Sequence, residues 1–162
     1  MSFQTTINRN PPIGIEGGFA SVSNTHNVLA GSGQFVAGAT GVVMGRFAYA
    51  DLATSKVTNA KVAGAPIGFV RRGDNTAVIT NWLGADTMTI PAGFGVTLYD
   101  RGDFWVKTKT AATVGQAVFA SDTTGEISTG AVGATVAGST EVPHFKVASN
   151  GAVGDLIKIS AF

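Results

Sequence analysis

The sequence predicts an all-β fold, jelly-roll-like or a compact β-barrel or sandwich with short strands, preceded by an extended N-terminal arm. Glycine supplies 22 of the 162 residues and interrupts almost every window in which apolar residues could repeat at helical spacing. Short segments in which apolar and polar residues alternate are common instead, and this alternation is typical of strands with one buried face. Many short strands connected by glycine-rich turns indicate a sandwich or a barrel.

The first 20 residues differ from the rest and are predicted to form the extended arm, whereas residues 21–162 are expected to form a single β domain. Two adjacent prolines favour an extended polyproline backbone, and the glycines that follow provide no side chains for packing. The apolar residues and prolines of the arm are the expected contacts with a capsid subunit or a second copy of the chain: Phe3, Ile7, Pro11, Pro12, Ile13 and Ile15. A disordered tail and an ordinary edge strand are the alternative interpretations of this segment.

Short strands are expected wherever the alternation extends over several residues, at positions 43–49, 67–71, 78–83, 87–90, 96–99, 104–107, 142–148 and 156–160. Asp100 and Gly102 predict a tight hairpin between residues 98–99 and 104–106, because aspartate caps turns and glycine readily adopts a positive φ. Asp122 and Gly125 predict a second hairpin tip for the same reason.

One short sequence motif occurs twice, as VGQAVFAS at positions 114–121 and as VGDLIKIS at positions 153–160. Gly115 and Gly154 are expected to adopt a positive φ at a sharp entry into a strand, with Gln116 and Asp155 at the polar turn position. A looser relative occurs in PAGFGVTLYD, with Gly95 just before the strand. Two copies do not indicate a solenoid, which needs at least three stacked units.

Charged residues make up 13% of the chain, against roughly 25% in an average soluble domain. This composition fits either a weakly charged surface or a surface that is buried against partners. With 11 basic and 10 acidic residues the net charge is +1, so neither nucleic acid nor a membrane is expected as a partner. Arg71 and Arg72 form the longest basic run and are interpreted as a solvated strand end.

No cofactor, metal ion or catalytic site is expected, and the chain is therefore not expected to be an enzyme. There is no cysteine, and neither His26 nor His144 has a second ligand at a suitable spacing. Ser32 lies between glycines but lacks the strand-turn-helix context of a nucleophile elbow, and the glycines around it match no phosphate-binding pattern. The N-terminus has no secretory signal pattern, which predicts synthesis in the cytoplasm.

Two short features are compatible with a ligand-binding role. The tripeptide RGD at positions 101–103 is recognised by some receptors, although the predicted hairpin accounts for each of its residues. Trp82, Tyr99 and Trp105 could form an aromatic platform for sugars, or they could pack in the core or on a sheet face.

Five segments together resemble the structural cement proteins of tailed bacteriophages, which decorate and clamp the outer capsid. The segments are MSFQTTINRNPPIGIEGGFASVS, VLAGSGQFVAGATGVVMGRFAYAD, AGAPIGFVRR, TMTIPAGFGVTLYDRGDFWVKT and ATVGQAVFASDTTGEIS. The likeness extends in consistent order from the start of the chain to about Ser128. Beyond it, FKVASNGAVGDLIKIS is similar to the terminal strands of related decoration proteins.

The resemblance implies a cement protein that binds the outer capsid at junctions between major capsid protein subunits and stabilises the head against internal DNA pressure. It also implies a place in the virion, the major capsid protein as partner, and a small homo-oligomer, for which a homodimer is expected in preference to a homotrimer. Several contacts per oligomer would allow each one to be weak. A carbohydrate-binding or host-adhesion module displayed on the virion is the main alternative, and a small β-barrel hydrolase is the third hypothesis.

Overall fold

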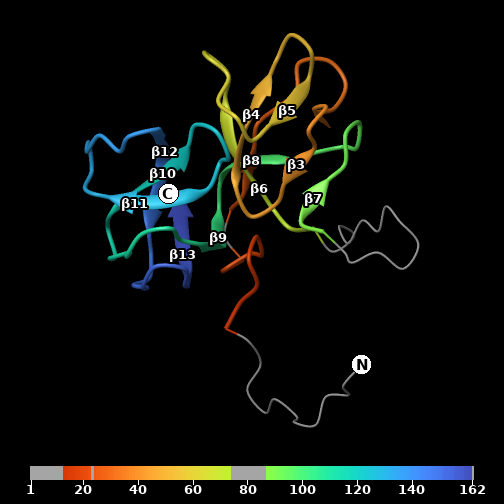
Figure 1. Ribbon diagram of the computed structural model, residues 1–162. Helices are drawn as coiled ribbons and strands as arrows, with labels where there is room; N and C mark the ends of the chain where they lie inside the picture. The colour runs from red at the N-terminus through yellow and green to blue at the C-terminus, as the bar shows by residue number, and fades with distance from the viewer. Residues whose placement is uncertain (1–12, 23, 74–86, 162) are drawn as a thin grey trace, which may run out of the picture.

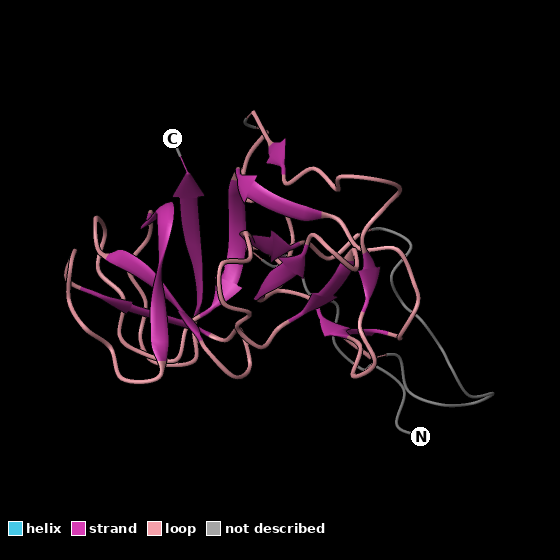
Figure 2. Cartoon of the chain, turned by 90° about the horizontal axis from the view of Figure 1, so that it is seen from above, coloured by secondary structure: helices cyan, strands magenta, loops and turns pink. Residues whose placement is uncertain are grey.

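The computed structural model describes residues 13–22, 24–73 and 87–161, and this part of the chain contains thirteen strands and no helix (Figures 1 and 2). The predicted all-β class is therefore confirmed, whereas the expected strand at 78–83 lies outside the described residues. The strands are β1 His26–Asn27, β2 Val36–Ala37, β3 Val42–Val43, β4 Phe47–Asp51, β5 Lys56–Thr58, β6 Ile67–Val70, β7 Thr89–Ile90, β8 Leu98–Arg101, β9 Asp103–Lys107, β10 Ala117–Ser121, β11 Ile127–Gly130, β12 Ser139–Val147 and β13 Leu156–Ala161.

The strands form two large sheets that pack against each other as a sandwich, and a small third sheet. The six-stranded sheet has the order β1-β8-β6-β4-β5-β2, the five-stranded sheet the order β11-β10-β12-β13-β9, and β3 pairs with β7. In Figure 1 the five-stranded sheet lies on the left in blue and teal. Among the strand pairs only β2 and β5 run parallel in the described residues.

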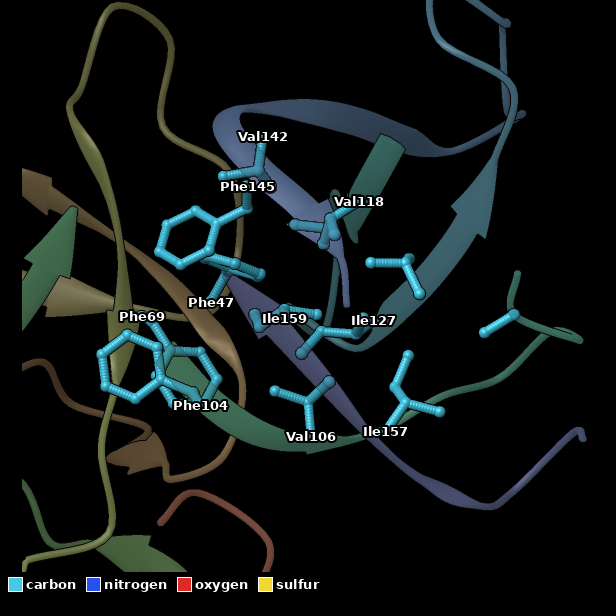
Figure 3. Packing of buried hydrophobic residues seen from close by; sticks show 13 residues of the cluster. Phe47, Phe69, Phe104, Val106, Val118, Ile127, Val142, Phe145, Ile157 and Ile159 are labelled. Carbon is cyan, nitrogen blue, oxygen red and sulfur yellow. The ribbon is translucent and has the colours of Figure 1, made fainter. Parts of the chain in front are cut away.

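Buried aromatic rings fill the space between the two large sheets (Figure 3). Phe47 and Phe69 come from the six-stranded sheet, and Phe104 and Phe145 come from the five-stranded sheet. The ring centroids of Phe69 and Phe104 lie 4.5 Å apart, and those of Phe47 and Phe145 lie 5.3 Å apart. Contacts at these separations add to the free energy of apolar burial, so this cluster holds the two sheets together.

A second buried cluster covers the opposite face of the six-stranded sheet. Ala48 and Ala50 of β4 belong to this second cluster, together with Val42 of β3 and Ile90 of β7, whereas Phe47 belongs to the first. Both faces of β4 are therefore buried. This explains why β4 consists of small and aromatic residues from Phe47 to Ala50, before it ends at the half-buried Asp51.

The expectation of one continuous strand at 43–49 is wrong, because the segment divides into β3 and β4. Gly45 between them has a φ of +75°, which no regular strand accommodates. The buried side chain of Asn59 joins the two parts. Its Oδ1 accepts a hydrogen bond from the Val43 N–H at 2.7 Å, and its Nδ2 donates to the carbonyls of Val43 and Phe47 at 3.2 and 3.0 Å.

The predicted hairpin between 98–99 and 104–106 is also wrong, because its two strands lie in different sheets. β8 pairs with β1 and β6, whereas β9 pairs with β13. Gly102 has the expected positive φ, at +137°, but the turn forms a corner between sheets. Asp100 does not cap it: Oδ1 of Asp100 lies 2.6 Å from Nδ1 of His26 on β1. The second hairpin is confirmed, since β10 pairs antiparallel with β11 and Gly125 has a φ of +65°.

The two copies of the repeated sequence motif have the same local structure. Gly115 and Gly154 have φ values of +90° and +87°, and strands β10 and β13 begin two residues later, at Ala117 and Leu156. The side chain of Gln116 accepts a hydrogen bond from the N–H three residues before it at 2.9 Å, and Asp155 does so at 2.8 Å. The predicted strand-entry turn is therefore confirmed in both places.

The same backbone turn recurs elsewhere in the domain. We call it the glycine turn: its third residue is a glycine with positive φ, and its fourth N–H donates to its first carbonyl, which is type II geometry. In PAGFGVTLYD the turn glycine is Gly93, with a φ of +82°, and not Gly95 as expected from sequence. Glycine turns occur at 15–18, 62–65, 91–94, 113–116, 131–134, 136–139 and 152–155.

Candidate functional site

The described end of the N-terminal segment, residues 13–20, lies along β9, at one edge of the five-stranded sheet. The Gly17 N–H donates to the Trp105 carbonyl at 2.8 Å, and the Trp105 N–H donates to the Gly18 carbonyl at 2.9 Å. The Ala20 N–H donates to the Asp103 carbonyl at 2.9 Å. Residues 17–20 therefore extend the sheet by one short strand-like segment.

Glycines allow this close approach. A Cβ on Gly14 would lie 2.4 Å from the Trp105 ring, so only glycine lets the backbone lie flat on the indole. Gly17 has a φ of +80° and turns the chain, while its carbonyl accepts a hydrogen bond from the Arg72 N–H at 2.9 Å. Because Arg72 follows β6 of the other large sheet, the segment contacts both halves of the sandwich.

Large apolar side chains remain exposed along this segment. Ile13 is 88% exposed, Ile15 51% and Phe19 41%. They line an open cleft of about 560 Å³, whose floor includes Trp105. A contiguous apolar patch of this kind is typical of a surface that binds another macromolecule.

Basic side chains surround the apolar part of the cleft. The Arg71 guanidinium lies 4.3 Å from the centre of the Phe19 ring, and the Lys158 ammonium lies 5.1 Å from that of Trp105. Arg72 also lines the cleft. None of these three cations forms an ion pair with a carboxylate in the described ranges, and no described acid lines the cleft. The surface is therefore both apolar and positively charged.

The structure brings together two of the predicted contact residues, Ile13 and Ile15. The others, Phe3, Ile7, Pro11 and Pro12, lie outside the described residues. Sequence reasoning missed the other large side chains of the cleft: Phe19, Arg71, Arg72, Trp105 and Lys158. The sequence LIKIS gave an indication of Lys158, because this lysine interrupts an otherwise apolar strand. Its contact with Trp105, however, depends on the register of β13 and β9.

The RGD tripeptide is not presented as a free ligand. Asp103 lies half-buried on β9, and its carboxylate accepts hydrogen bonds from the hydroxyls of Ser21 and Ser160, the latter at 2.5 Å. Gly102 is buried. The carboxylate therefore connects the N-terminal segment to β13, which is a structural role.

The proposed sugar platform is not assembled from the described aromatic residues, and Trp82 lies outside them. Tyr99 packs with its ring 5.6 Å from that of Phe104, against the core between the sheets. Trp105 is 8% exposed, since Gly14 and Lys158 lie against its ring. Packing accounts for both side chains.

Both histidines line a second groove, of about 610 Å³, near β1 and β12. His144 is exposed, as expected for a surface strand position, and its φ of +74° marks an irregularity within β12. Within the described ranges, no three histidine, cysteine or acidic side chains lie close enough to hold a metal ion. Nor does any helix long and apolar enough to cross a membrane occur there.

An ion cluster fastens the tip of the β10–β11 hairpin to the other sheet. The Glu126 carboxylate lies 3.0 Å from the Lys109 ammonium and 3.1 Å from the Arg46 guanidinium. The hydrogen bond from Lys109 is the largest cause of a lowered pKa of Glu126; burial opposes it and the charge of Arg46 adds to it. This cluster belongs to the packing of the two sheets and not to the cleft.

Comparison with known proteins shows the family to which the chain belongs. The sequence model of the family described as "XM1 gp53 minor capsid protein" matches residues 3–161. A solved structure, "The capsid of Myoviridae Phage XM1", contains a chain that superimposes with a TM-score of 0.64 at 16% identity, covering 99% of this chain and 97% of that one. No curated protein matches.

The class of protein follows from this agreement of family and fold: it is a structural protein of a phage virion, associated with the capsid. The chain belongs to the XM1 gp53 minor capsid protein family. The structural likeness, at 16% identity, shows the shared fold.

Proposed function

We propose that this protein is a cement protein that binds the outer capsid at junctions between major capsid protein subunits and stabilises the head against internal DNA pressure. The observation that supports this role is the exposed apolar and cationic cleft along residues 13–20. Membership in a minor capsid protein family supports the capsid as the partner. The role is structural and not enzymatic.

In this proposal residues 1–20 act as an arm on a β domain of residues 21–162. Burial of Ile13, Ile15 and Phe19 against a neighbour would each contribute up to about 1.5–3 kcal/mol, less what is already buried. The three side chains together contribute at most about 5–9 kcal/mol per arm, before the entropic cost of ordering the chain on its partner. The net gain per arm is smaller than this, and several arms that act on one particle would together provide the stability.

The protein is further proposed to form a homodimer, in preference to a homotrimer, and to bind neither nucleic acid nor membrane. The net charge of +1 supports the absence of a polyelectrolyte interaction. The alternative role in host adhesion gains no support from the two features that suggested it, since Asp103 and Trp105 are both engaged within the domain.

The test compares wild type with an Ile13→Ser/Ile15→Ser variant on capsids stripped of this protein. We expect wild type to restore resistance of the particles to heat, measured as the temperature of DNA release, and the variant to restore clearly less. Leu52→Ser, at a residue 54% exposed elsewhere on the domain, is the control and should behave as wild type. Particles whose heat resistance does not change when wild type binds would contradict the cement role.

A further inference from the structure

The chemistry of the cleft defines what can occupy it. Its floor is apolar, with Ile13, Ile15 and Phe19 exposed, whereas Arg71 and Lys158 provide positive charge beside that floor. An occupant must therefore offer both apolar groups and negative charge. A cation without a carboxylate partner forms stronger hydrogen bonds with a carboxylate than with a neutral acceptor, because charge-assisted hydrogen bonds are the stronger kind.

The two cations are held in place before anything binds. Each lies over an aromatic ring, Arg71 over Phe19 and Lys158 over Trp105, so less side-chain freedom is lost on binding than with free side chains. Glu16, the acid within residues 13–20, does not neutralise them, since its side chain packs against Gly45 and does not line the cleft.

The backbone at the cleft is incompletely paired as well. The neighbours of Phe19 direct their hydrogen bonds to β9, and the N–H and C=O of Phe19 itself have no hydrogen-bond partner in the described part of the chain. An extended peptide can satisfy such an edge by adding a strand. A phosphate group has neither a peptide backbone to pair with Phe19 nor apolar side chains to cover the floor of the cleft. These observations therefore favour a peptide over nucleic acid or lipid.

We propose that the cleft binds an extended, acidic and apolar segment of a capsid protein, with its carboxylates at Arg71 and Lys158 and its apolar side chains on Ile13 and Phe19. This inference rests on the proposed function and names the part of the partner that the surface recognises. The resulting contact combines apolar burial with charge pairing at a partly dehydrated site, where salt screens the pairing only in part.

The test removes the charge and keeps the length of the side chains. Arg71→Met/Lys158→Met retains two long apolar stems without cations, and Lys56→Met/Lys107→Met removes two exposed lysines outside the cleft as a matched control. Binding to stripped capsids is measured at 50, 150 and 500 mM NaCl (about 14, 8 and 4 Å of screening length). Circular dichroism and thermal unfolding confirm that each variant is folded.

We expect the cleft variant to bind about 10- to 100-fold more weakly at the lowest salt concentration, with a flatter salt dependence, and the control to remain within about 3-fold of wild type. On an array of peptides covering the major capsid protein, wild type should retain peptides with acidic and apolar residues together, and the cleft variant should lose them. Equal binding of the cleft variant and wild type to capsids overturns this inference and leaves the cement role intact.

Two other outcomes also decide the question. If wild type fails to bind stripped capsids, the proposed function fails and the inference with it. If the difference between wild type and the cleft variant occurs on phosphatidylglycerol vesicles or duplex DNA and not on capsids, the cleft recognises phosphate, and the peptide proposal is wrong.

Discussion

Gly125 at the tip of the β10–β11 hairpin provides the sharpest test of how the two sheets are joined. Its φ is +65°, and an added Cβ would lie 2.0 Å from the carbonyl oxygen of Phe47. The contact cannot relax easily, because the Phe47 N–H donates to the Gly125 carbonyl at 3.0 Å and the Phe47 side chain is fully buried. Gly125→Ala should therefore separate the hairpin tip from β4.

The expected cost has two parts. A non-glycine residue in the left-handed region costs about 1–2 kcal/mol. Displacement of the tip, with loss of its hydrogen bond and packing, adds about 2–3 kcal/mol. We expect the free energy of unfolding to fall by about 3–5 kcal/mol in total, which for a chain of this size lowers Tm by roughly 10 °C.

The matched control is Gly154→Ala. Its φ of +87° imposes a similar backbone cost, but no atom lies within 4 Å of the added Cβ. Urea unfolding followed by circular dichroism should place the two variants at least about 2 kcal/mol apart. If both variants lower the free energy of unfolding by the same amount, the steric contact between the hairpin tip and β4 does not exist in solution and the reasoning fails.

Two further predictions concern polar groups that join the sheets. Asn59→Ala should lower the free energy of unfolding by about 2–4 kcal/mol in urea titrations, because the part-buried backbone groups of Val43 and the buried carbonyl of Phe47 lose a partner. A loss below about 1 kcal/mol would contradict this prediction. The pKa of Glu126 is lowered in the folded protein, so the ionised carboxylate stabilises the fold. This stabilisation is fully present above the ordinary pKa near 4.5, and it is lost as the pH falls through the lower pKa of the folded state. Thermal unfolding from pH 7 to pH 3 should therefore show a smaller acid destabilisation for Glu126→Gln than for wild type, and equal pH dependence would refute it.

The sequence predicted best the positions of three strands. Strands β6, β9 and β13 lie within or very near the expected ranges 67–71, 104–107 and 156–160. A period of two is visible in LIKIS, whereas IGFV and FWVK are short apolar runs rich in β-branched and aromatic residues, which also favour strands. Strands of two residues, such as β1 and β2, show no such period, because two residues do not establish an alternation.

Two errors arose where the sequence signal was ambiguous. A glycine within an apolar run is compatible with a strand, yet Gly45 ends one strand and allows another to begin. The Asp-Arg-Gly-Asp sequence favours a turn, but a turn does not determine whether the next strand pairs with the previous one. In this chain β9 pairs with β13 of the other sheet, and Phe104 enters the core between the sheets from that side.

The candidate site was predictable only in its apolar part. Ile13 and Ile15 are evident because they are large side chains in a segment otherwise rich in glycine and proline. The cations of the cleft come from distant parts of the chain, and only the pairing of the N-terminal segment with β9 brings Arg71 and Lys158 near them. Such proximity is a property of tertiary structure.

The consecutive glycine turns at 131–134 and 136–139 have a practical consequence for protein engineering. An added Cβ on Gly133 or Gly138 would meet no atom within 4 Å, and Val132 is 65% exposed. Exposed loop tips of this kind are where proteins best accept inserted sequence. This loop contributes no residue to the cleft. It is therefore the natural place to insert a foreign epitope or enzyme tag, which would present one copy of the insert for every copy of this protein on the virion.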